Sequence, residues 1–165
     1  MDTLILGVGN PILSDDAVGI RIAEKLKEEN PGLEVATTSE AGINLLDLVA
    51  GYDRLIIIDS IMTEKGKVGE VYQLNLEDLK PSAECRSSHG IGITTAFEFG
   101  QKLGYIMPRY VSIYAVEIKD NATFREQCTR EIERSIPLIA RQILEKEKLG
   151  KLLSAKKSKE KARSN

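Results

Sequence analysis

The 165-residue chain has few cysteines and no long apolar run, and each of these absences excludes a class of protein. The two cysteines, Cys85 and Cys128, lie far apart and have no partner at CxxC spacing, so a disulfide scaffold is excluded. No apolar run reaches the length of about 18 residues that a transmembrane helix needs. The N-terminus has no basic region before its first apolar stretch, which argues against a signal peptide. These features predict a cytoplasmic protein that is not inserted in a membrane.

The net charge of −2 conceals two parts of opposite sign. Residues 151–165 contain six basic side chains and one acidic side chain, so this segment carries +5 and the rest of the chain about −7. The acidic body argues against nucleic acid as the main partner. The basic segment has no aromatic residues between its charges, so we expect residues 150–165 to form a solvated, disordered tail. Residues 1–149 are long enough to form a single domain with its own core.

Short apolar segments alternate between strand and helix patterns for most of the length. The first helix pattern has Val18, Ile22 and Leu26 on one face, and the aliphatic segment 54–59 has the character of a central strand covered on both faces. The expected strands are 3–7, 33–39, 54–59, 68–76 and 110–116, and the later helices are 43–49, 91–103 and 123–148, with Pro137 as a kink or break. Segment 68–76 fits an antiparallel neighbour. This order predicts an α/β fold built as a three-layer sandwich.

Acidic residues follow the first and third expected strands. Asp15 and Asp16 stand at the start of the first helix, where one acid is enough for a cap and the second is left over. Asp16 is the better candidate for a metal ligand, and Asp15 for a cap or a supporting group. Asp59 ends the aliphatic strand, where a partly buried carboxylate needs a hydrogen bond, an ion pair or a metal. Backbone N–H groups of the turn at residues 60–62 would also satisfy it.

His89 is the only histidine, and it lies in the sequence Ser-Ser-His-Gly-Ile-Gly at the start of an expected helix. Because the C-terminal ends of strands in an α/β sheet meet at one edge, His89 could meet Asp16 and Asp59 there. Two carboxylates and one imidazole would form a hard-to-borderline metal site. His89 could instead cap the helix or be a structural loop residue. Cys85, four residues earlier, leaves a Cys–His nucleophilic pair as a further alternative.

The segment Gly7-Val8-Gly9-Asn10 has the first two glycines of a dinucleotide-binding fingerprint, but Ile12 stands in place of the third. Asp15 and Asp16 would also repel a pyrophosphate at the helix N-terminus. We expect the glycines instead to allow a sharp turn that leaves the acids pointing into a cleft.

Five segments, taken in order, resemble the hydrogenase maturation endopeptidase family, which trims the C-terminus of the [NiFe]-hydrogenase large-subunit precursor. They are Leu4-Ile5-Leu6-Gly7-Val8-Gly9-Asn10, Ser14-Asp15-Asp16 with Gly19-Ile20-Arg21, Glu40-Ala41-Gly42 before Leu45-Leu46, Leu55-Ile56-Ile57-Ile58-Asp59, and Ser88-His89-Gly90. The resemblance runs from about residue 3 to residue 145, which is most of the chain.

The resemblance implies a twisted, mostly parallel five-stranded sheet between helices, with residues 1–149 as the peptidase domain. It also implies an endopeptidase that removes the precursor's C-terminal extension after nickel insertion, with Asp16, Asp59 and His89 as catalytic residues and metal ligands. Many members have Glu at the position of Asp16 and others have Asp. The implied nickel arrives in the substrate precursor rather than as a tightly bound cofactor. The alternative is an assembly chaperone that senses nickel with the same three residues and cuts nothing.

Overall fold

The computed structural model describes residues 1–79, 89–151 and 153–154, and five strands in these ranges form one sheet. The strands are β1 (Thr3–Val8), β2 (Glu34–Thr38), β3 (Arg54–Ile61), β4 (Val71–Leu74) and β5 (Tyr110–Glu117). Their order in the sheet is β2-β1-β3-β5-β4. All neighbours are parallel except β4, which pairs antiparallel with β5. The predicted α/β fold is confirmed, including its antiparallel fourth strand.

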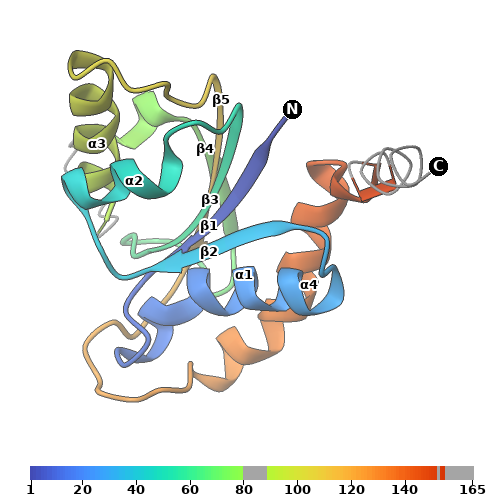
Figure 1. Ribbon diagram of the computed structural model, residues 1–165. Helices are drawn as coiled ribbons and strands as arrows, with labels where there is room; N and C mark the ends of the chain where they lie inside the picture. Colours follow the sequence, from blue (N-terminus) through green and yellow to red (C-terminus); the bar gives the residue numbers. More distant parts are fainter. Residues whose placement is uncertain (80–88, 152, 155–165) are drawn as a thin grey trace.

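Helices cover both faces of this sheet (Figure 1). The α-helices are α1 (Val18–Glu29), α2 (Leu46–Val49), α3 (Gly90–Lys102) and α4 (Arg130–Lys146), and the 3₁₀ turns are η1 (Ser14–Ala17), η2 (Gly42–Leu45) and η3 (Leu76–Leu79). α1 and α4 pack on one face, and α2 and α3 on the other. Among the described residues, no helix has the length and apolar character of a membrane-spanning segment.

The central strand β3 separates two apolar cores. Successive side chains of a strand point to opposite faces of the sheet. Ile56 and Ile58 pack with residues of α1 and α4, whereas Leu55 and Ile57 pack with residues of α2 and α3. All four side chains are at most 1% exposed. Burial of each contributes about 1.5–3 kcal/mol, so this aliphatic run holds the three layers together.

Several element boundaries differ from those predicted. β4 is shorter than the predicted segment 68–76, and the predicted helix 43–49 is divided into η2 and α2. β3 continues two residues beyond Asp59, because it stays paired with β5 as far as Ile61 opposite Glu117. The final helix begins at Arg130 rather than at residue 123. The Asp120 side chain accepts hydrogen bonds from the backbone N–H groups of Ala122 and Thr123. This local bonding competes with a helix. α4 runs through Pro137 without a break.

The last described residues pack against the α1 and α4 face. Leu149 is fully buried, and Leu153 contacts the same apolar core and approaches Gly32. Residues 152 and 155–165, which include most of the basic segment, lie outside the described residues. The packed part of the chain therefore includes residue 153.

Candidate active site

The three residues singled out in the sequence lie at one edge of the sheet, where the parallel strands have their carboxyl ends. Asp16 lies in η1 after β1, Asp59 lies near the end of β3, and His89 directly precedes α3. Hydrogen bonds connect all three through one further residue, Ser60. The predicted meeting of these side chains at a common edge is therefore observed.

Asp59 and His89 form a buried pair. His89 Nδ1 lies 3.1 Å from Asp59 Oδ1, and the same oxygen accepts the Ser60 N–H at 2.8 Å. The side chains of His89 and Asp59 are 12% and 2% exposed. Burial disfavours the protonated imidazole, but the hydrogen bond to Asp59 and the charges of Asp59 and Asp16 outweigh it and raise the pKa of His89. The hydrogen bond between Asp59 and His89 thus fixes the orientation of the ring and favours its doubly protonated, positively charged form.

Asp16 receives hydrogen bonds from the β1–α1 turn and from β3. Its Oδ2 accepts the Asn10 N–H at 2.9 Å, and its Oδ1 accepts the Ser60 hydroxyl at 2.9 Å. Neither η1 nor α1, both within the described part of the chain, has a side-chain hydrogen bond at its N-cap. The predicted capping of the first helix by Asp15 or Asp16 is wrong, because the 3₁₀ turn places both carboxylates against other segments.

Asp15 connects the turn that carries Asp16 to the start of α4. Its carboxylate accepts the Thr129 N–H at 2.6 Å and the Thr129 hydroxyl at 3.0 Å, and Thr129 is the N-cap residue of α4. The Asp15 N–H donates to the Asp120 carbonyl at 3.0 Å. Asp15 is fully buried, so these bonds attach the turn before α1 to the segment before α4. Asp15 therefore holds the turn that carries Asp16, and its predicted role as a supporting group of a metal ligand stays a prediction.

Gly9, in the loop after β1, and Gly19, in the first turn of α1, allow close packing rather than the expected sharp turn. A Cβ atom on Gly9 would lie 2.2 Å from the Asp16 carbonyl oxygen, and one on Gly19 would lie 2.2 Å from the Ile58 carbonyl oxygen. The positive φ in this loop belongs to Ser14, at 49°. α1 can therefore begin directly against the ends of β1 and β3, which brings Asp16 to the sheet edge.

Gly19→Ala is accordingly expected to destabilise the protein by about 1–3 kcal/mol, because the added methyl group meets backbone that cannot move aside. Urea denaturation followed by circular dichroism measures this loss. Gly150→Ala is the matched control: no atom lies within 4 Å of its added Cβ, and alanine favours the helical backbone there. Equal stability of Gly19→Ala and the wild type would contradict this account of the packing.

The described residues contain no group of three histidine, cysteine, aspartate or glutamate side chains already placed to hold a metal ion. Asp16 and the Asp59–His89 pair are linked through Ser60 instead. The assignment of Asp16, Asp59 and His89 as metal ligands and catalytic residues stays a prediction.

Neither cysteine can be identified as a nucleophile in the described part of the chain. Cys85, the candidate partner of His89, lies outside the described residues. Cys128 is 4% exposed, and burial together with the nearby charges of Glu133 and Asp15 raises the pKa of its thiol to about 12. Cys128 is therefore an uncharged thiol at neutral pH and is unsuited to nucleophilic attack.

A family model described as hydrogenase maturation protease matches residues 20–146, which is most of the chain. The chain belongs to this family. The matched range contains Asp59 and His89 and begins after Asp16. The resemblance inferred from the sequence motifs is confirmed.

Individual members of the hydrogenase maturation protease family agree with this placement. The hydrogenase 2 maturation protease of Escherichia coli (strain K12) is 38% identical over 82 residues, which cover 48% of this chain and 50% of that protein. The chain thus spans about half the length of this curated relative. The structure of the hydrogenase maturating endopeptidase HybD from E. coli matches with a TM-score of 0.75 at 26% identity, over 91% of this chain and 94% of that chain. The [NiFe] hydrogenase maturation protease HybD from Thermococcus kodakarensis matches with a TM-score of 0.67 at 27% identity, over 88% and 98%.

Proposed function

We propose that this member of the hydrogenase maturation protease family is an endopeptidase that removes the C-terminal extension of a [NiFe]-hydrogenase large-subunit precursor after nickel insertion. The observation that carries the proposal is the Asp59–His89 pair, joined to Asp16 through Ser60 at the carboxyl edge of the sheet. The named relatives are proteases and endopeptidases of hydrogenase maturation, and this supports the reaction class. The cytoplasm is the compartment we expect from the cysteine usage.

Nickel enters this proposal as part of the substrate. Carboxylate oxygen and imidazole nitrogen are donors that nickel accepts, and three protein ligands leave positions for ligands from the precursor. Because Asp59 engages His89 Nδ1, we assign the other ring nitrogen, Nε2, to contact with the metal. A carboxylate that orients a histidine in this way is common beside metal ions in proteins. Asp16 and Asp59 would supply the carboxylate contacts.

Hydrolysis requires water to add to the carbonyl carbon of the scissile bond and a proton to reach the departing amine. Asp16 or Asp59 can take the proton from the attacking water as general base, which would make the enzyme an aspartyl-type peptidase. A water bound to the nickel of the substrate is the second possible nucleophile. Both routes use the same residues, and neither needs a serine or cysteine nucleophile.

The test compares three substrates: the nickel-loaded precursor, the same precursor without nickel, and an unrelated peptide mixture. Mass spectrometry should show one cut near the C-terminus of the loaded precursor, and no cut in the other two. The reason is that the complete site forms only when the precursor brings its metal. Binding of the loaded precursor without cleavage would favour the assembly chaperone. If the protein cleaves the nickel-free precursor, and a chelator abolishes this cleavage while zinc restores it, the proposal that the substrate carries the metal would be wrong.

A further inference from the structure

The last residues of β3 present neighbouring side chains to opposite faces of the sheet. Asp59 lies on the face covered by α3 and contacts His89, which directly precedes that helix. Ser60 lies on the face covered by α1 and contacts Asp16 in η1, the 3₁₀ turn that precedes α1. This placement follows the alternation of the apolar residues earlier in β3. His89 and Asp16 therefore contact the strand from opposite faces of the sheet.

Ser60 bonds to both of them. Its backbone N–H donates to Asp59 Oδ1 at 2.8 Å, and its hydroxyl donates to Asp16 Oδ1 at 2.9 Å. Ser60 itself is 2% exposed, and it pairs with Val116 in β5. The pairing of β3 with β1 ends at Ile58, but its pairing with β5 continues to Ile61, so the backbone of Ser60 is still held by the sheet.

We propose that Ser60 is a positioning residue that sets the orientation of Asp16 relative to the Asp59–His89 pair, an inference that rests on the proposed function. The side chain of Asp16 is attached to a short 3₁₀ turn, whereas Asp59 belongs to the central strand. A hydroxyl-to-carboxylate bond is charge-assisted and directional, so it selects one rotamer of Asp16. Ser60 is buried and reaches the reaction through Asp16, which distinguishes it from a catalytic residue.

The hydroxyl group matters here more than the volume of the side chain. Asp16 is 4% exposed, and a buried carboxylate is costly unless donors satisfy it. Asn10 supplies a backbone donor to Oδ2, and Ser60 supplies a side-chain donor to Oδ1. Loss of the Ser60 donor would let the carboxylate turn away from the arrangement that the two bonds define.

Ser60→Ala and Ser60→Cys test this role, with Ser112→Ala in the neighbouring strand β5 as control. Alanine removes the hydroxyl, while cysteine keeps a side chain of similar shape and offers only a weak donor. Both Ser60 variants should lower kcat for the nickel-loaded precursor by about 10- to 100-fold, as is usual when a group orienting a metal ligand is lost. KM should change by less than about threefold, because Ser60 is buried and exposes almost no surface to a substrate. Ser112→Ala should behave like the wild type.

Several outcomes would overturn the role of Ser60. Wild-type kcat in Ser60→Cys would show that the side chain only fills space, and a raised KM with unchanged kcat would place it in substrate binding. A second readout does not depend on cleavage: urea unfolding of Ser60→Ala, Asp16→Asn and the double variant. The losses of stability should be non-additive, and additive losses would overturn the coupling. A wild-type protein that leaves the loaded precursor uncut, with non-additive losses, would refute the proposed function and retain the Ser60–Asp16 link.

Discussion

Asp59→Asn is expected to abolish precursor cleavage while the protein stays folded. Asparagine keeps the shape of the side chain, and its Oδ1 can still accept the Ser60 N–H. It removes the negative charge that faces His89 and that would act on water or nickel. The rate of trimming should fall by about 10²- to 10⁴-fold, the range associated with general acid–base groups. Mass spectrometry of the nickel-loaded precursor over time measures the rate, and circular dichroism checks the fold.

Asp53→Asn is the matched control, because Asp53 precedes the other end of β3. Its side chain is 57% exposed and accepts the Asp2 N–H, far from the carboxyl edge. This variant should cleave at the wild-type rate.

His89→Ala should show the same loss as Asp59→Asn, since the two side chains act as a pair. Full activity of His89→Ala would mean that the histidine is only structural.

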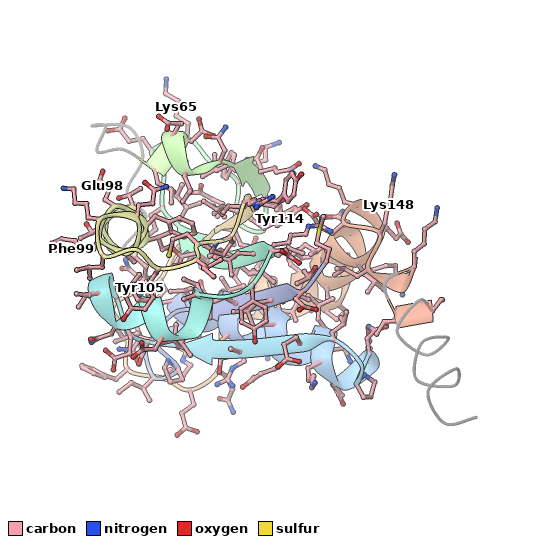
Figure 2. The ribbon with its side chains drawn as sticks, turned by 45° about the horizontal axis from the view of Figure 1, so that its top comes forward. Lys65, Glu98, Phe99, Tyr105, Tyr114 and Lys148 are labelled. Atoms are coloured by element: carbon pink, nitrogen blue, oxygen red, sulfur yellow. The ribbon has the colours of Figure 1, made fainter. Side chains whose placement is uncertain are left out.

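Glu147→Ala is expected to lower the free energy of unfolding by about 3–5 kcal/mol, the cost of breaking a buried ion pair. Glu147 is 6% exposed, directly follows α4, and pairs with the Arg54 side chain at the start of β3. It also accepts the hydroxyl of Tyr114, which lies between the sheet and α4 (Figure 2). Burial raises the pKa of Tyr114, against the opposing charge of Arg54, so the phenol keeps its proton for this bond. The variant removes the charged partner of Arg54, which keeps only its bond to the backbone carbonyl of residue 147, and it removes the acceptor of the Tyr114 hydroxyl.

Glu145→Ala controls for the loss of a glutamate at the same end of α4. Glu145 is exposed, so its replacement should change stability by less than about 0.5 kcal/mol. Urea denaturation of the two variants gives the comparison. Cleavage by folded Glu147→Ala should remain close to that of the wild type, because the pair lies at the amino end of β3. If Glu147→Ala lowers the free energy of unfolding by less than about 1 kcal/mol, the Arg54–Glu147 ion pair contributes little to stability.

The sequence was sufficient to predict the sheet and the edge that carries the site. The aliphatic run Leu55–Ile58 could only be a strand covered on both faces, and it is the central strand. Asp16, Asp59 and His89 were identified because each follows a strand or opens a helix, and parallel strands bring such positions together. These inferences depend on short-range patterns, which the fold preserves.

Long-range contacts were beyond the sequence patterns. The sequence pattern does not single out Ser60, because the aliphatic run predicts that the strand ends at Asp59. In the structure the strand continues, and its alternation places the serine on the opposite face. Asp15 was assigned to the nearest helix, whereas its partner Thr129 is 114 residues away. The predicted start of α4 is too early for two reasons: the Asp120 side chain bonds locally to the residues after it, and Arg125 forms a bridge with Leu13 that no local pattern predicts.

The contacts between Asp15 and Thr129 also determine when the candidate site can be complete during synthesis of the chain. The turn that presents Asp16 leaves the ribosome early, but the groups that fasten it, Asp120, Arg125 and Thr129, are made more than a hundred residues later. At elongation rates of about 5–20 residues per second, the turn is synthesised about 5–20 s before these partners. A nascent chain that stops short of Thr129 therefore contains every residue of the candidate site and still lacks the fastening that holds Asp16 at the sheet edge.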